Sequence, residues 1–102
     1  MIRPSSFRYN EDTSKDNFFQ SKVDNLNDNE IQLAAIYEFE NMCSILRENG
    51  INIIVCENEK NKNLSDDVFP NNWISFHKDK YVIHSMYAES RRKEKNISFI
   101  ET

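Results

Sequence analysis

The strongest pattern in the chain is an apolar stripe of helical period between residues 28 and 49. Hydrophobic side chains recur there at spacings of four, four, three and four residues, at Ile31, Ala35, Phe39, Met42 and Leu46. Such spacing places them on one face of an α-helix. Asn27 and Glu30 have the spacing of a capping box, and Gly50 stands where a left-handed C-terminal cap is needed. The pattern predicts one long helix whose apolar face packs in the core.

Apolar segments of shorter period predict strands around this helix. Residues 51–56, INIIVC, are nearly all apolar and β-branched, which is typical of a strand covered on both faces. Two more strands are expected at 73–77 and 81–86, joined by a Lys-Asp-Lys turn. Residues 1–7 predict a short edge strand, because Pro4 has no N–H to donate to a ladder.

The remaining segments carry weaker signals. Residues 8–26 are polar and irregular, with Phe18, Phe19 and Val23 as their apolar anchors. Residues 90–102 have the composition of the start of a second helix. Helices and strands thus intermix without a regular βαβ alternation, and the predicted fold class is α+β, a mixed α/β module. We expect 1–102 to form one domain or a part of one.

Charge and cysteine content exclude several classes of protein. A net charge of −4 and a pI near 5.1 give no basic face for nucleic acid. The chain has one basic run, formed by Arg91, Arg92, Lys93 and Lys95. Cys43 and Cys56 have neither the spacing of a zinc site nor the number for a disulfide scaffold, which predicts free thiols in a reducing cytoplasm. No signal peptide and no transmembrane stretch is expected, so no membrane partner is predicted.

Residues 66–77, DDVFPNNWISFH, concentrate chemistry in a short stretch: two acids, a proline, two asparagines and the single tryptophan. His77 and His84 lie seven residues apart across the expected hairpin, where they could meet as metal ligands. A third ligand is not evident from the sequence. We therefore predict no metal site and no cofactor, and a core-packing role for Trp73.

Three blocks together resemble one family: RPSSFRYNEDTSKDNFFQ at 3–20, FPNNWISFH at 69–77 and SRRKEK at 90–95. They are similar to the amidinotransferase-like guanidino-group-modifying enzymes, closest to the citrulline-utilization hydrolases. Arginine deiminases and dimethylarginine dimethylaminohydrolases are more distant relatives. The resemblance covers the whole chain but only the N-terminal third or so of such an enzyme. It implies a partial pentein fold (β/α-propeller), about one strand-helix-strand module and the start of the next.

The resemblance also implies a chemistry. In this family a Cys thiolate attacks the central carbon of a guanidinium or ureido group, and a His acts as general acid and base. The family carries both groups in later modules. The resemblance therefore implies a truncated N-terminal fragment of such a hydrolase, which contributes substrate-binding residues and lacks the catalytic Cys and His. Cys43 and Cys56 have no sequence cue for an activated thiol.

Five residues match substrate-binding positions of the family. Asp66 matches an acidic or amide position, and Asn71 and Asn72 match the two polar positions after the Phe. Asn72 stands where many relatives place a carboxylate, and an amide suits a neutral ureido group better than a cation. The implied substrate is thus an amino acid such as citrulline, in preference to arginine. Arg91 or Arg92 matches a basic position that can meet the substrate carboxylate.

Other interpretations stay open at this point. Arg91 and Arg92 could equally be surface residues paired with Glu89 or Glu94. The chain could be a non-catalytic interaction or assembly module that self-associates, or pairs with a complementing chain, through exposed strands.

A third interpretation is a stand-alone metal enzyme built on Asp66, His77 and His84. It requires the two histidines and the carboxylate to converge on one ion.

Overall fold

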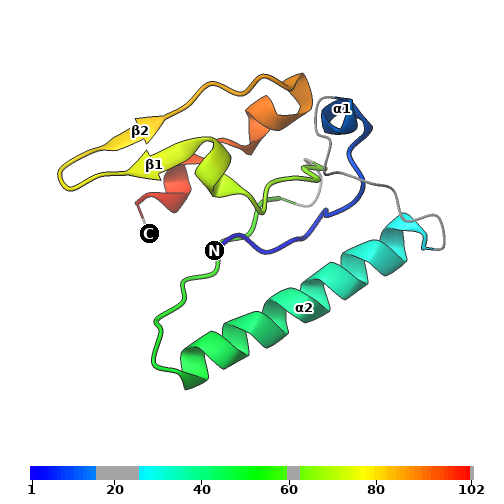
Figure 1. Ribbon diagram of the computed structural model, residues 1–102, viewed down its shortest axis with the longest axis horizontal. Coiled ribbons are helices and arrows are strands. Elements are labelled where there is room, and N and C mark those ends of the chain that lie inside the picture. The colour runs from blue at the N-terminus through cyan, green and yellow to red at the C-terminus, as the bar shows by residue number, and fades with distance from the viewer. Residues whose placement is uncertain (16–25, 60–62, 102) are drawn as a thin grey trace.

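The structure of the chain is a computed structural model that describes residues 1–15, 26–59 and 63–101 (Figure 1). These residues form a mixed α+β fold, as the sequence predicts. Its helices and strands are α1 (Glu11–Ser14), α2 (Asp28–Glu48), β1 (Ile74–Phe76) and β2 (Tyr81–Ile83). Short 3-10 helices lie at Pro70–Asn72, Glu89–Glu94 and Ile97–Phe99. Phe18, Phe19 and Val23 lie outside the described residues.

Helix α2 begins and ends where its sequence signals predict. The Asn27 side chain accepts from the Glu30 N–H at 2.9 Å, and the Glu30 carboxylate accepts from the Asn27 N–H at 3.0 Å. This is a complete capping box, which satisfies two donors at the N-terminus. At the other end Gly50 has a φ of +79°, and its N–H bonds the Arg47 carbonyl. The Ile51 N–H bonds the Leu46 carbonyl, which completes a Schellman motif.

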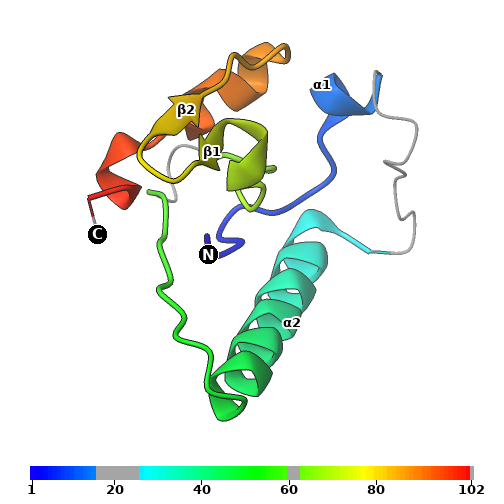
Figure 2. The same ribbon diagram turned by 60° about the vertical axis from the view of Figure 1, so that its left-hand side comes forward.

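The apolar face of α2 is only partly covered. Phe39 and Cys43 are buried, whereas Met42, which the sequence places in the core stripe, is 43% exposed. The helix is held to the N-terminal segment by polar contacts: Arg3 pairs with Glu40 at 2.9 Å and Gln32 donates to a backbone carbonyl of residue 5. In both views the N-terminal segment runs between α2 and the hairpin (Figures 1 and 2). Contacts along this segment therefore set the position of the helix.

The predicted strand at 51–56 is wrong. It forms one isolated parallel bridge, Ile2 to Cys56, and Ile51 and Ile54 are about half exposed. The ladder stops because Pro4 has no N–H and the N–H of the next residue turns back to the Arg3 carbonyl at 2.8 Å. The predicted edge strand at 1–7 is also wrong, because only Ile2 pairs before the chain turns.

The predicted hairpin is confirmed, with shorter strands. β1 and β2 pair antiparallel, with Ile74 opposite Ile83 and Phe76 opposite Tyr81. The buried residues of this region are Trp73, Ile74 and Met86, against which Ile100 packs. The second helix predicted to begin in residues 90–102 does not form, and the chain has two 3-10 helices there, Glu89–Glu94 and Ile97–Phe99. The first of them places a charged segment beside the loop that enters β1.

Candidate functional site

The loop that enters β1 turns through short-range backbone bonds. The Phe69 N–H bonds the Asp66 carbonyl at 3.2 Å, and the Asn72 N–H bonds the Phe69 carbonyl at 3.0 Å. Pro70 fits the first position of its 3-10 helix because it needs no donor there. Trp73 follows and is 1% exposed. The buried tryptophan anchors the loop, and the polar residues before it are held at the surface of the core.

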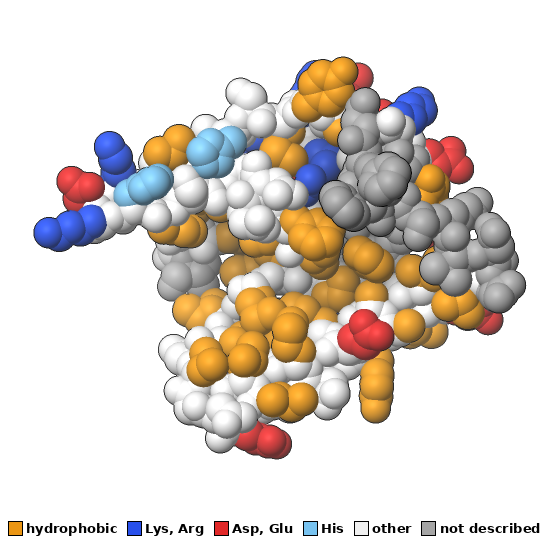
Figure 3. Space-filling view, in the orientation of Figure 1, with side chains coloured by type: hydrophobic (Ala, Val, Ile, Leu, Met, Phe, Trp, Pro, Cys, Tyr) orange, Lys and Arg blue, Asp and Glu red, His pale blue; other side chains and the backbone are white. Residues whose placement is uncertain are grey.

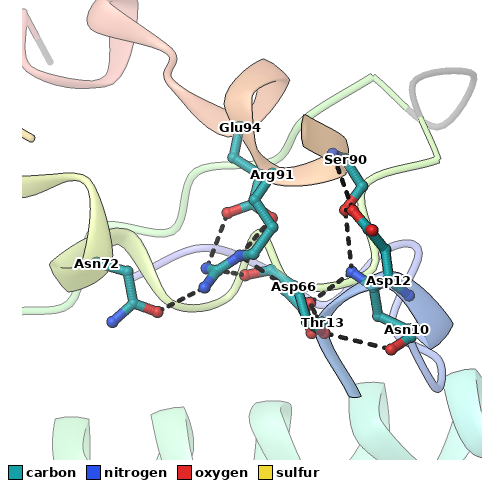
Figure 4. Close-up of polar contacts among 8 residues, drawn as sticks. All are labelled: Asn10, Asp12, Thr13, Asp66, Asn72, Ser90, Arg91 and Glu94. Carbon is teal, nitrogen blue, oxygen red and sulfur yellow. Dashed lines mark hydrogen bonds and ion pairs between the residues drawn. The ribbon is translucent and has the colours of Figure 1, made fainter. Parts of the chain in front are cut away.

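The carboxylate of Asp66 is buried and joins this loop to the N-terminal segment (Figure 4). Its Oδ2 accepts from Asn10 Nδ2 at 2.7 Å and from Thr13 Oγ1 at 3.2 Å. Asn10 also caps α1 through its side-chain oxygen, which accepts from the Asp12 N–H at 3.1 Å. No hydrogen bond within the described part of the chain falls on Oδ1 of Asp66. One carboxylate oxygen is therefore fixed and the other is open.

Arg91 reaches across the loop from the 3-10 helix Glu89–Glu94 (Figure 4). Its Nε and one terminal nitrogen each lie 3.0 Å from a carboxylate oxygen of Glu94. Its other terminal nitrogen donates to Asn72 Oδ1 at 2.8 Å. The terminal nitrogen that contacts Glu94 also donates to the Asp66 carbonyl at 3.2 Å, and Nε lies 4.0 Å from Asp66 Oδ2. The side chains of Asp66, Asn72 and Arg91, three of the predicted site residues, thus come together.

The other two predicted site residues lie apart from this group. Arg92 donates to the carbonyls of Met86 at 3.1 Å and Tyr87 at 3.0 Å, and so holds the chain that leaves β2. Asn71 is exposed on its 3-10 helix. The roles of all five residues in substrate binding stay predictions.

We call this group the Asp66 cluster: Asn10, Thr13, Asp66, Asn72, Arg91 and Glu94. Sequence reasoning missed Asn10 and Thr13, and it named Glu94 only as a surface partner of Arg91 or Arg92. A second contact nearby links Ser90 to Asp12, whose carboxylate accepts from the hydroxyl at 2.8 Å and from the N–H at 3.4 Å. Both N-terminal residues, Asn10 and Thr13, belong to the block at 3–20 that carries the family resemblance. The block indicated the family but not which of its residues contact Asp66, because a polar segment of irregular period predicts neither a helix face nor a strand face.

Burial sets the electrostatics around the cluster. Desolvation raises the pKa of Glu94, although the hydrogen bonds and the charge of Arg91 oppose the rise. Desolvation also raises the pKa of Asp67, against the hydrogen bond from Asn58 Nδ2 at 3.0 Å. Oδ1 of Asp67 is buried without a hydrogen-bond partner in the described part of the chain. By contrast, the hydrogen bonds from Ser90 lower the pKa of Asp12.

A polar cavity of about 350 Å³ adjoins the cluster. It is lined by residues 8–12 together with Asp28, Asn63, Ser65 and Ser90. Three carboxylates and one guanidinium, from Glu11, Asp12, Asp28 and Arg8, give it an acidic balance. Its lining suits a small polar molecule that carries nitrogen donors.

The described residues offer neither a cluster of metal ligands nor a membrane-spanning helix. Within 1–15, 26–59 and 63–101, no three or more His, Cys, Asp or Glu side chains are grouped to hold a metal ion. The stand-alone metal enzyme is therefore not supported, because Asp66 bonds Asn10 and Thr13 whereas both histidines meet on Ser75. No described helix is long and apolar enough to cross a membrane.

The two cysteines lie in structural positions. Cys43 is fully buried on α2, and Cys56 is half-buried with its backbone in the parallel bridge to Ile2.

The chain is similar to one family of enzymes over nearly its whole length. A family model described as "N,N dimethylarginine dimethylhydrolase, eukaryotic" matches residues 3–102. The chain belongs to this family. The match confirms the resemblance to guanidino-group-modifying enzymes, and it lies in a branch that the sequence analysis placed among the more distant relatives of the citrulline-utilization hydrolases. No curated protein and no solved structure matches the chain.

The dimethylhydrolase match spans all three blocks that carry the resemblance. It therefore covers every residue of the Asp66 cluster, including Asn10 and Thr13 at one end and Glu94 at the other.

Proposed function

We propose that the chain supplies the substrate-binding side of a guanidino- or ureido-group hydrolase of the pentein fold. Residues 1–102 are its N-terminal portion, and the reaction uses a Cys nucleophile carried on later modules. The observation that carries this proposal is the family match over residues 3–102. Alone, the chain holds an amino acid substrate weakly and does not turn it over, because orientation without a nucleophile gives no covalent step. We place it in the cytoplasm, with free Cys43 and Cys56.

The geometry of Asp66 supports its role toward the head group. Asn10 and Thr13 fix Oδ2, so the plane of the carboxylate is set before a ligand arrives. The open Oδ1 is an acceptor for N–H groups, which guanidinium and ureido groups both present. Hydrogen bonds to a charged acceptor contribute about 1.5–3 kcal/mol each. Asp66 is therefore the anchor of the proposed site.

The orientation of Asn72 favours a neutral head group. Arg91 occupies its Oδ1 at 2.8 Å, so the amide N–H₂ is the part left to face a ligand. A guanidinium presents only donors and cannot accept from this amide, whereas a ureido carbonyl can. The proposed substrate is thus a ureido amino acid such as citrulline, in preference to arginine or the dimethylarginine of the family name.

Arg91 and Arg92 have different roles in this proposal. Every nitrogen of Arg91 is engaged, by Glu94, Asn72 and Asp66, so Arg91 orients the two residues that meet the head group. Arg92 is exposed, and two of its three guanidinium nitrogens bond backbone carbonyls. Its remaining nitrogen is the candidate contact for the substrate carboxylate, and Asn71 is a further candidate polar contact.

A titration of the isotopically labelled chain, followed by NMR, tests the head group. Citrulline, arginine and N,N-dimethylarginine are added separately, and citrulline is expected to bind more tightly, by roughly tenfold at most. Asn72→Asp should reverse the order, because a carboxylate accepts from the cationic head groups. The control is Asn41→Asp, an exposed position on α2. Tighter binding of arginine to the unmodified chain contradicts the neutral head group, and absence of binding by all three contradicts the proposed function.

A second candidate function is assembly through the exposed hairpin. Phe76 is 68% exposed and Tyr81 is 47% exposed, although both belong to paired strands. Figure 3 shows hydrophobic side chains gathered on the face that spans α2 and the hairpin. Such a surface favours pairing with a second copy or a complementing chain. Light scattering over a range of concentrations tests it: Phe76→Ser should abolish any dimer, and a monomer at all concentrations contradicts self-association.

A further inference from the structure

The two histidines of the chain meet on one hydroxyl at the exposed hairpin. Ser75 Oγ lies 3.2 Å from Nε2 of His77 and 3.0 Å from Nε2 of His84. The chain has no other histidine. Figure 3 shows their rings next to each other along the hairpin.

Strand register explains the convergence. Ser75 and His77 are two residues apart on β1 and its extension, so they share a face of the hairpin. Val82 pairs with Ser75, and His84 follows Val82 by two residues, with its backbone N–H bonded to the Trp73 carbonyl at 2.7 Å. Both imidazoles thus point along the same face toward one oxygen. Antiparallel pairing holds the backbones that carry them.

The two imidazoles are arranged so that both could bind one metal ion. In the described part of the chain neither imidazole bonds a side chain other than Ser75. The Ser75 hydroxyl has one proton and can donate to only one neutral Nε2. The other ring therefore either donates its own Nε2–H to Ser75 Oγ or makes no hydrogen bond to it. Both histidines are exposed, which leaves room for water to complete a coordination shell.

We propose that His77 and His84 form an exposed two-histidine site for a divalent transition-metal ion. The ion replaces the two hydrogen bonds to Ser75 with two bonds to Nε2, and water fills the remaining positions. Imidazole nitrogen favours Cu²⁺ over Ni²⁺ and Zn²⁺ and does not suit Mg²⁺, which requires oxygen ligands. Lys80 lies across from His77, and its positive charge limits the affinity. The site is independent of the Asp66 cluster.

Isothermal titration of the full chain with Cu²⁺, Zn²⁺ and Mg²⁺ tests the proposal. One Cu²⁺ should bind per chain, more tightly than Zn²⁺, and Mg²⁺ should not bind. His77→Gln and His84→Gln should each weaken Cu²⁺ binding at least about tenfold, since even residues that only orient metal ligands cost 10–100-fold. Ser75→Ala should leave binding in place, because the hydroxyl is displaced. Cys56→Ser is the control for a thiol ligand and should also leave binding in place.

An independent measurement uses the spectra of the chain. Paramagnetic Cu²⁺ should broaden the two histidine ring signals first, and saturating Zn²⁺ should raise the midpoint of thermal unfolding only when both histidines are present. Unchanged affinity for Cu²⁺ in either histidine variant, or loss of binding in Cys56→Ser, overturns the proposal. Absence of saturable binding by the unmodified chain, or its loss in Ser75→Ala, overturns it as well.

Discussion

Arg91 and Glu94 form a two-point ion pair one turn apart, with both nitrogen–oxygen distances at 3.0 Å and the Glu94 side chain 1% exposed. Breaking such a pair leaves a buried charge without its partner. We therefore expect Arg91→Ala to reduce the free energy of unfolding by about 3–5 kcal/mol. This is a large share of the roughly 5–15 kcal/mol typical of a domain. Urea denaturation measures the loss.

Arg92 is the matched control for this prediction. It is the next residue and carries the same group, but it is exposed, and among the described residues its hydrogen bonds go to the carbonyls of Met86 and Tyr87. Arg92→Ala should cost about 1 kcal/mol. Equal losses in the two variants would show that the ion pair with Glu94 contributes nothing specific.

The buried carboxyl of Asp67 should give the chain an unusual pH dependence. Its pKa is raised above the ordinary value of 3.8 by burial, so the folded state holds the proton more tightly than the unfolded state. The contribution of Asp67 to stability therefore falls as pH rises from 3.8 through the raised pKa. The pKa of Glu94 is also raised, so its contribution to stability falls in the same direction. The pKa of Asp12 is lowered, so the contribution of Asp12 is lost as pH falls through its own lowered pKa. Asp67→Asn should gain stability relative to the unmodified chain as pH rises toward neutrality.

Unfolding curves collected across that pH range measure this effect, with Asp79→Asn as the control. Asp79 lies exposed in the hairpin turn, so its substitution should shift all curves equally. A constant difference between Asp67→Asn and the unmodified chain at every pH would contradict the raised pKa.

Trp73 should tolerate loss of its ring nitrogen better than loss of its volume. It is 1% exposed, and Nε1 is buried without a hydrogen-bond partner among the described residues. Trp73→Ala should cost about 3–5 kcal/mol because it opens a cavity. Trp73→Phe should cost no more than about 1–2 kcal/mol, since it also removes the unsatisfied N–H.

Tyr87→Ala is the control for aromatic truncation, because Tyr87 is 85% exposed and should change stability by no more than about 0.5 kcal/mol. Thermal or urea unfolding ranks the three variants. If Trp73→Phe were as damaging as Trp73→Ala, the nitrogen would have a partner that stabilises the fold.

The capping box should account for much of the stability of the first turn of α2. Asn27→Ala removes the acceptor for the Glu30 N–H and should cost about 0.5–2 kcal/mol, measured by the loss of helical circular dichroism on heating. Asn29→Ala, inside the first turn, is the control and should be neutral or slightly stabilising, since Ala favours the helix. A larger loss from Asn29→Ala would contradict the cap.

Local signals predicted α2 and its caps because each depends on residues within one or two turns. The same holds for the hairpin, where the Lys78-Asp79-Lys80 turn fixes the register locally. The strand expected at 51–56 failed because strand formation depends on a distant partner. Here that partner is the N-terminal segment, and Pro4 turns it away after one bridge.

In the candidate site, too, residues with a local sequence signal were predicted and residues that depend on distant contacts were not. Asp66 and Asn72 were predicted from a motif, and the structure brings Arg91 to them. Asn10 and Thr13 were missed because they approach Asp66 across more than fifty residues of sequence. No local pattern encodes such a contact, so only the fold reveals which polar residues hold the carboxylate.

Titration of citrulline into the chain and into Asp66→Asn tests the central claim most directly. Asp79→Asn, an exposed acid of the hairpin turn, is the control for loss of one negative charge. We expect citrulline to perturb the NMR signals of Asp66, Asn72 and their neighbours, and Asp66→Asn to weaken binding by about 10–100-fold, the equivalent of a hydrogen bond to a charged acceptor. Equal binding by Asp66→Asn and Asp79→Asn would contradict the assignment of the Asp66 cluster as the head-group site.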